Sequence, residues 1–194
     1  MPYLATPTVP AGALRGRDQP HLDLDDVALR PWREDDAPTV KAAFDCPDIQ
    51  RWHLRRMDSE DEALAWTRGW EVRWALETDA SWAVVDHATD VPLGQVGLRT
   101  VSLHEGDAQL SYWVLPAHRG RGLAVRAVRG VERWVFGEVG LHRLSLHHSA
   151  ANEASCRVAA KLGFALEGTL REALVHADGP HDVHCHARLS TDPR

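Results

Sequence analysis

The stretch Leu110–Ala124 constrains the fold and function of this chain more than any other. It begins as an apolar segment, is interrupted at Pro116, continues as a basic glycine-rich turn and leads into a helical pattern. Glycine lets the main chain approach a ligand closely, and the free N–H groups of a helix N-terminus attract anions. We therefore predict a phosphate or pyrophosphate site here. Its residues are Arg119, Gly120, Arg121, Gly122, Leu123 and Ala124.

The turn matches neither of the common nucleotide-binding glycine motifs. It lacks the Gly-Lys-Ser/Thr ending of a Walker A motif and the spacing of G-x-G-x-x-G. The alternative is a plain strand-to-helix connection in which glycine serves only the backbone.

The hydrophobic pattern predicts an α/β fold with a mixed central sheet of about seven strands and helices on both faces. Residues 1–20 carry proline and glycine without periodicity, so we expect a flexible or loosely docked extension, followed by a single domain over 21–194. Predicted strands cover 27–31, 82–85, 94–98, 108–115, 144–146, 170–175 and 183–189, and predicted helices run from 35 or 36 to 44 and over 60–77, 123–136 and 152–162.

Composition excludes several functional classes. The net charge of −6 argues against a general nucleic-acid-binding protein, and no segment approaches the length of a membrane span. The N-terminus has no secretory apolar region. Three scattered cysteines are typical of reduced thiols, so we expect a cytoplasmic protein. They are Cys46, Cys156 and Cys185.

Three ordered motifs resemble one known family. Arg119-x-x-Gly122-x-Ala124 is similar to the R/Q-x-x-G-x-G/A signature of the GCN5-related N-acetyltransferases (GNAT). Tyr112–Pro116 resembles a strand of its RimJ/RimL branch, which acetylates ribosomal proteins, and Asn152–Phe164 resembles that branch's N-x-x-S…K-L-G-F segment. The resemblance covers about residues 25–190 and implies the GNAT fold.

The resemblance also implies a reaction. A primary amine, at a protein N-terminus or on a small molecule, would attack acetyl-CoA or another acyl-CoA directly in a ternary complex. The turn would hold the pyrophosphate. The backbone of Val114 and Leu115, after a bulge, and the side chain of Asn152 would contact pantetheine, although Asn152 also suits a helix N-cap. Ser155 would protonate the leaving thiolate. The branch often dimerises, which leaves a homodimer open.

Two departures from the branch concern the general base and the acceptor. Gln109 stands where a glutamate often orders the deprotonating water, and Leu174 replaces a second acidic residue. Trp52 and His53 resemble a loop that contacts the acceptor in this branch, and Gln109 is placed there too. Candidate bases that stay open are His53, His147, His148, Glu105, Asp107 and Glu172. Also open are a non-catalytic acyl-CoA-binding or regulatory module, a succinyl-CoA donor and an antibiotic-like amine acceptor.

The histidine-rich C-terminal stretch is predicted not to bind metal. In a strand, His184 and His186 share one face while Cys185 points away, so these three do not form a natural ligand set. Separately, Trp66, Trp70 and Trp74 recur every four residues and favour a core-facing helical stripe.

Overall fold

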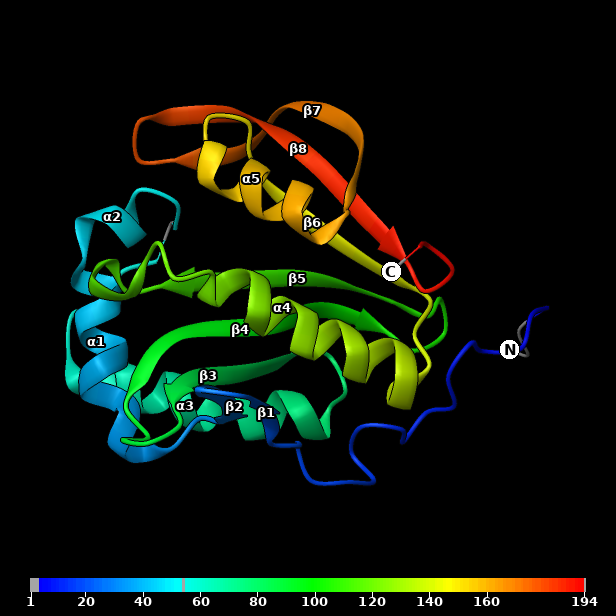
Figure 1. Cartoon of the computed structure of the whole chain (residues 1–194), viewed down its shortest axis with the longest axis horizontal. Coiled ribbons are helices and arrows are strands. Elements are labelled where there is room, and N and C mark those ends of the chain that lie inside the picture. The colour runs from blue at the N-terminus through cyan, green and yellow to red at the C-terminus, as the bar shows by residue number, and fades with distance from the viewer. Residues whose placement is uncertain (1–3, 54, 194) are drawn as a thin grey trace.

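The computed structural model describes residues 4–53 and 55–193 and contains one mixed sheet of eight strands (Figure 1). The strand order is β1-β2-β3-β4-β5-β6-β8-β7, and only the β5–β6 pair is parallel. The strands are β1 (Leu22–Leu24), β2 (Val27–Pro31), β3 (Ala80–Asp86), β4 (Pro92–Ser102), β5 (Asp107–Val114), β6 (Arg143–Ser149), β7 (Ala165–His176) and β8 (Gly179–Leu189).

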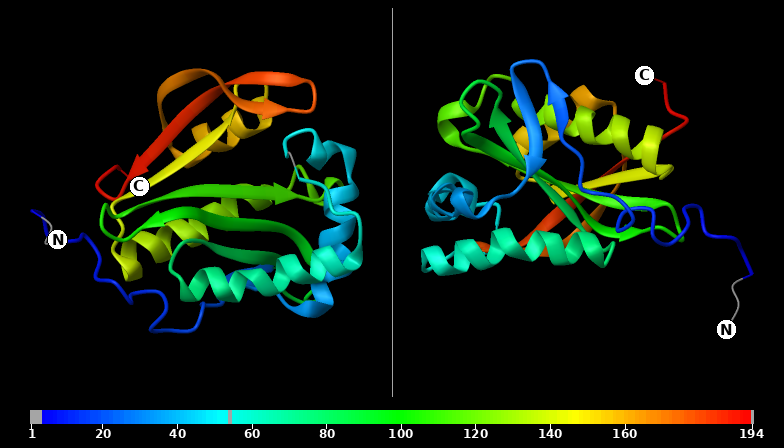
Figure 2. Two further views of the ribbon diagram at one scale, coloured as in Figure 1. Left: turned by 180° about the vertical axis from the view of Figure 1, so that it is seen from behind. Right: turned by 90° about the horizontal axis from the view of Figure 1, so that it is seen from below.

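Helices cover both faces of this sheet, and the right-hand view of Figure 2 shows α3 and α4 on opposite sides. The α-helices are α1 (Ala37–Asp45), α2 (Pro47–Gln50), α3 (Glu60–Ala75), α4 (Leu123–Trp134) and α5 (Glu153–Leu162). Short turns of other helix types are η1 (Glu34–Asp36), η2 (Pro116–His118) and the π-helical η3 (Val135–Val139), which continues α4. None of the helices in 4–53 and 55–193 is long and apolar enough to cross a membrane.

Local signals explain where the helices begin and end. The Ser59 hydroxyl accepts a hydrogen bond from the Glu62 N–H at 3.2 Å, and the Glu62 carboxylate accepts from the Asp58 N–H at 2.7 Å, which caps α3. Gly163 ends α5 in the left-handed conformation, with φ of 74°. Both caps agree with the sequence prediction.

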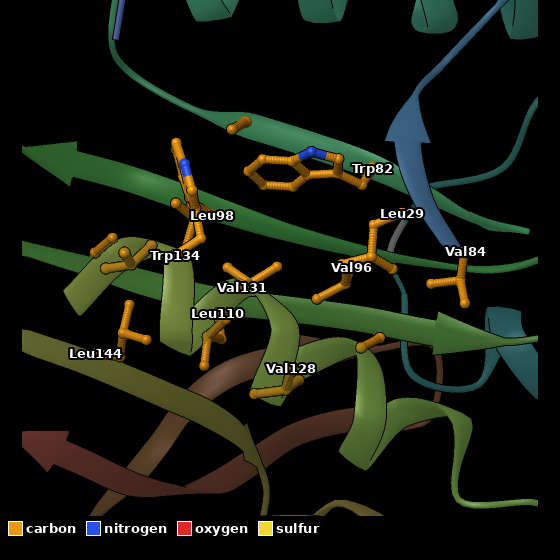
Figure 3. Packing of buried hydrophobic residues seen from close by; sticks show 14 of the residues in the cluster. Leu29, Trp82, Val84, Val96, Leu98, Leu110, Val128, Val131, Trp134 and Leu144 are labelled. Atoms are coloured by element: carbon orange, nitrogen blue, oxygen red, sulfur yellow. The ribbon is translucent and has the colours of Figure 1, made fainter. Parts of the chain in front are cut away.

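Two hydrophobic clusters fill the two sides of the sheet. The cluster under α4 joins Val128, Val131 and Trp134 to strand residues such as Trp82 and Leu110 (Figure 3). The other cluster packs α1 and α3 against Trp113 and neighbouring residues of β3. The predicted tryptophan stripe of α3 is confirmed, because Trp70 and Trp74 are buried and Trp66 packs partly buried against the second cluster. Since successive β5 side chains alternate between clusters, each β5 residue can be assigned to one face.

The described part of the N-terminal segment, residues 4–20, is docked on the domain around Val9 and Leu14, although most of its residues are exposed. Val9 and Leu14 are 3% and 1% exposed in the α4 cluster. The Val9 N–H donates to the Leu103 carbonyl at 2.9 Å, and the Glu77 carboxylate accepts from the Gly12 and Leu14 N–H groups at 2.7 Å each. Within residues 4–20 the buried apolar residues are Val9 and Leu14, with Ala13 packed beside them, which is too few to produce a hydrophobic period in the sequence.

The sheet has one strand more than the predicted seven, which is β1. This strand is only three residues long and pairs antiparallel with β2. The helix α2 was also missed, because it spans a single turn after the break at Pro47. β7 begins at Ala165 rather than at 170, and its irregular register with β8 hides the alternation that marks a strand.

Candidate active site

The strands β5 and β6 pair only over their first halves and then separate. Parallel pairing joins Asp107–Leu110 to Arg143–Leu146 and stops there. Beyond Leu110, β5 pairs only with β4, while β6 continues along β8 (Figure 1). The separation leaves one edge of β5 without a neighbouring strand, and such an edge can take an extended ligand as an added strand.

Tyr112 and Val114 carry the backbone groups of this open edge. The Leu115 N–H donates to the Leu93 carbonyl at 3.0 Å and therefore points toward β4. Because backbone direction alternates along a strand, the groups of Tyr112 and Val114 point away from β4. The Leu115 carbonyl also has a partner, the His118 N–H at 2.9 Å. The backbone of Leu115 is therefore satisfied within the chain, which disfavours its predicted contact with pantetheine. The Val114 carbonyl also has a partner, Arg119 Nε, so the Val114 N–H and the Tyr112 backbone groups form the open edge.

The opening of β5 does not arise from a bulge near Val114, as the resemblance implied. The β4–β5 register is continuous from Gly94↔Val114 to Arg99↔Gln109 and shifts only between Arg99 and Ser102, at the other end. The cause of the opening is instead the divergence of β6 toward β8.

The predicted glycine turn leads directly into α4. Gly120 and Gly122 have φ of 79° and 72°, in the left-handed region that other residues adopt at a cost. Gly122 is the N-cap of α4, and a Cβ built on either glycine meets no atom within 4 Å. The first N–H groups of α4, beginning at Leu123 and Ala124, have no partner within the helix. The turn therefore presents open space above a line of donors.

The arginines of the turn have acidic partners in this structure. Arg119 donates through Nη1 to Asp48 of α2 at 2.8 Å and through Nε to the Val114 carbonyl at 3.1 Å. Arg121 lies 3.8 Å from Asp26. Both are exposed, so these ion pairs are weak and an anion can replace them. Arg119 also fixes the end of β5 to α2, a structural role that the sequence did not reveal.

Ser155 and Tyr112 lie together beside the open edge. The Asn152 side chain accepts a hydrogen bond from the Ser155 N–H at 3.1 Å, so the predicted N-cap role of Asn152 is confirmed. Ser155 is nearly buried in the first turn of α5. Burial raises the pKa of Tyr112 to about 12, although the nearby Ser155 hydroxyl opposes that rise. Tyr112 therefore keeps its proton at neutral pH next to the predicted acid. Among the described residues, the buried Tyr112 hydroxyl makes no hydrogen bond of ordinary geometry.

The predicted acceptor residues lie on the opposite face of β5. Gln109 directly precedes Leu110, whose side chain lies on the α4 face, so the Gln109 side chain lies on the opposite face, toward α1 and α3. In the β4–β5 ladder Gln109 stands opposite Arg99. Trp52 follows α2 and packs edge-on against His176 of β7, with ring centroids 5.9 Å apart. Burial first, then the charges of Arg99, His176 and Arg55, hold the pKa of His53 below its usual value.

This geometry separates the candidate bases. His53 lies beside Arg99, which pairs with Gln109, the position that lacks the expected glutamate. Asp107 lies at the closed end of the β5–β6 pair, and Glu172 is exposed on the edge strand β7. His148 packs on the α5 side, within a histidine cluster of its own. His53 therefore stays a candidate base.

A family model described as "Acetyltransferase (GNAT) domain" matches residues 26–165. The chain belongs to the GNAT acetyltransferase family. It is accordingly an acyl-CoA-dependent N-acetyltransferase, and the predicted family and fold are confirmed.

Relatives of this GNAT protein cover most of its length. The uncharacterized N-acetyltransferase YoaA of Bacillus subtilis (strain 168) is 25% identical over 87% of this chain and 96% of its own. The structure of a ribosomal-protein-S5-alanine acetyltransferase from Vibrio fischeri has a TM-score of 0.81 at 20% identity, covering 91% of this chain and all of that one. Mycobacterium smegmatis RimJ in complex with CoA-disulfide gives 0.78 at 24% identity, covering 88% and 86%.

Sequence inspection missed three residues of this GNAT site. Tyr112 stood in the strand motif, but its contact with Ser155 depends on how α5 crosses β5. Arg99 and His176 reach the site from β4 and from the β7–β8 hairpin, with no local motif to mark them. A surface hollow of about 570 Å³ along the outer side of α3 includes none of them.

Proposed function

We propose that this GNAT enzyme transfers the acetyl group of acetyl-CoA to the α-amine of a protein N-terminus that carries acidic residues. One observation carries the proposal: the unpaired edge of β5 lies between the α4 N-terminus on one side and Ser155 on the other. A ligand with a pyrophosphate, an extended amide-containing arm and a thioester matches these three features in that order. The fold neighbour from V. fischeri, a ribosomal-protein-S5-alanine acetyltransferase, supports a protein acceptor.

Acetyl-CoA is proposed to bind along the α4 face. Its pyrophosphate would accept hydrogen bonds from the turn at Gly120–Ala124, where the two glycines leave room. Its pantetheine amides would pair with the Tyr112 carbonyl and the Val114 N–H as an added strand, and the Asn152 amide would contact the same arm. Binding along β5 places the thioester at the separation of the two strands.

The transfer is a direct displacement. The neutral amine attacks the thioester carbon, and the backbone N–H of Tyr112, which lies at the strand separation, stabilises the resulting oxyanion. As the carbon–sulfur bond breaks, the thiolate takes the proton of the Ser155 hydroxyl, which lies beside Tyr112. The proton of the attacking amine passes through water to His53, whose lowered pKa keeps it unprotonated at neutral pH. Solvent water then returns a proton to the Ser155 oxygen, and His53 releases the amine proton to solvent, so both groups are restored.

Positive charge on the acceptor face favours an acidic acceptor. Arg99 is largely buried, and burial together with the charges of Arg55 and Arg73 lowers its pKa to about 10, while Asp79 opposes that change. A cationic acceptor such as an aminoglycoside would be repelled by these groups, whereas a carboxylate near the reacting amine would be attracted. This observation disfavours the antibiotic-like acceptor.

The proposal is tested with peptides that differ in charge. We expect acetyl transfer from acetyl-CoA to the α-amine of peptides with Asp or Glu after the first residue, at higher kcat/KM than to matched Lys peptides or an aminoglycoside. Succinyl-CoA in parallel tests the donor. Faster transfer to the aminoglycoside would refute the acceptor class, and CoA binding without transfer to any amine would favour the non-catalytic module.

Two substitutions test the residue roles. Ser155→Ala should lower kcat roughly 100-fold while CoA affinity stays nearly unchanged. The exposed Ser190→Ala is the matched control. Arg99→Gln should lower kcat/KM for acidic peptides about 10- to 100-fold but not for neutral ones. Arg133→Gln, on the exposed side of α4, makes the same charge change away from the site. Equal effects in a variant and its control would refute that role.

A further inference from the structure

Four potential metal ligands meet between α5 and the β6–β8 pair, and the proposed reaction does not use them. The ligand atoms of His148, Cys156, His184 and His186 all lie within 4.8 Å of one another. His184 and His186 are two apart on β8, and His148 stands opposite His184 in the β6–β8 ladder. Cys156 comes from α5, which packs over this face. The tertiary structure therefore replaces the unsuitable Cys185 with a cysteine from another element.

Hydrogen bonds orient two of the imidazoles toward the centre of the cluster. His148 Nδ1 lies 2.8 Å from the Ser149 carbonyl, and His186 Nδ1 lies 3.4 Å from the Phe164 carbonyl. A carbonyl only accepts hydrogen bonds, so each Nδ1 carries the hydrogen and each Nε2 carries a lone pair. Backbone carbonyls hold many metal-binding histidines in this way.

These lone pairs have no partner among the described residues. His148 and His186 are 6% and 8% exposed, and the Nε2 atom of each is buried without a hydrogen bond in this part of the chain. A buried unsatisfied acceptor destabilises a fold, so a pair of them at one place indicates a missing ligand. Their rings are stacked, with centroids 5.2 Å apart and planes 19° apart, so a single ion is within reach of both.

His184 and Cys156 provide the other two ligands. The Cys156 sulfur lies 3.4 Å from His184 Nδ1, and the His184 ring centroid lies 5.6 Å from that of His148 and 6.0 Å from that of His186. Cys156 and His184 are partly exposed, which gives an ion a path from solvent.

We propose that His148, Cys156, His184 and His186 bind a zinc ion. Three imidazoles and a thiolate are a zinc ligand set, and tetrahedral zinc with bonds of about 2.0–2.3 Å places its ligand atoms roughly 3.3–3.8 Å apart. The observed separations of up to 4.8 Å require only a small inward movement of the side chains. On binding, the Cys156 thiol releases its proton to solvent and the sulfur forms the metal bond. This site replaces the sequence expectation of no metal.

Zinc here would fasten the first turns of α5 to the sheet. Cys156 directly follows Ser155, and His148 lies on the strand that separates from β5. The ion would therefore hold Ser155 in position without touching the reacting atoms. Its existence does not depend on the identity of the acyl acceptor.

The test begins with chelator-stripped, reduced full-length protein. Zinc titration against a competing chromogenic chelator should give one ion per chain and a higher Tm. Co²⁺ should bind with the visible bands of a tetrahedral ion and the near-ultraviolet band of a cobalt–thiolate bond. Stoichiometry near zero, or a cobalt spectrum without the thiolate band, would overturn the proposed ligand set.

Matched variants keep the test independent of folding defects. Cys156→Ala and His186→Gln should each weaken zinc binding on the order of 100-fold or more, because each removes one of four ligands. Cys185→Ala, the neighbouring cysteine on the other face of β8, should bind zinc like the wild type. Circular dichroism of the metal-free proteins checks that all are folded. Equal zinc affinity in Cys156→Ala and Cys185→Ala would refute the site.

Discussion

Replacing Gly122 with alanine separates a ligand-binding role of the glycine turn from a purely structural one. Gly122 has φ of 72°, and alanine in the left-handed region costs about 1–2 kcal/mol. An added Cβ meets no atom within 4 Å, so steric clash adds nothing in the free protein. For a chain of this size the loss corresponds to a Tm decrease of roughly 2–5 °C.

CoA binding should suffer more than stability. The added methyl group occupies the open space above the N–H groups of α4, where the pyrophosphate is proposed to lie. Loss of one or two charge-assisted hydrogen bonds, at about 1.5–3 kcal/mol each, weakens CoA binding on the order of 10- to 10,000-fold. Isothermal titration with CoA measures this change.

Gly140 provides the matched control. It has nearly the same backbone, φ of 88° and ψ of 18° against 72° and 13°, and an added Cβ there meets only Val9 at 3.9 Å. It ends the helix that Gly122 begins, so it lies far from the turn. Gly140→Ala should lower Tm by a similar amount and leave CoA affinity unchanged. If the two variants bind CoA equally well, the turn does not hold the pyrophosphate.

Three further predictions concern stability. Burial first, and then the charges of Arg99, His176 and Arg55, lower the pKa of His53 in the folded chain, so the unfolded chain binds this proton more readily. The free energy of unfolding should therefore fall as pH drops below about 6.5, and urea titrations should show a smaller fall in His53→Gln. Asp36→Asn breaks the buried ion pair in which Arg30 Nη1 lies 2.7 Å from Asp36 Oδ2, and it should lower the free energy of unfolding in urea by about 3 kcal/mol. The exposed Asp45→Asn should lower it by less than about 0.5 kcal/mol. Leu14→Ala should cost about 2–5 kcal/mol in thermal unfolding because Leu14 is 1% exposed, and equal stability with the exposed Leu4→Ala would contradict the packing of this segment.

The sequence predicted those parts of the fold that depend on local chemistry. The apolar periods of α4 and the caps at Ser59 and Gly163 lie where expected, because each depends on residues within one or two turns. The glycine turn was predictable for the same reason. Short elements such as β1 and α2 were missed, since three or four residues carry no period and are stabilised by their neighbours.

The candidate site divides in the same way. Gly122, Asn152 and Ser155 stand within motifs and were identified from sequence alone. Tyr112 was part of a motif without an assigned role, and no sequence motif marked Arg99. Their roles depend on the tertiary structure, because they follow from which side chains of neighbouring elements lie on the same face of β5.

The sequence by itself determined the order of the longer elements, the glycine turn before α4 and the family, because these are properties of contiguous residues. Only the tertiary structure decided which residues meet across elements. It showed that β6 leaves β5 after Leu110, which opens the edge proposed to bind the donor. It also brought Cys156 of α5 to histidines of β6 and β8, a juxtaposition set by helix-on-sheet packing and strand register rather than by spacing along the chain.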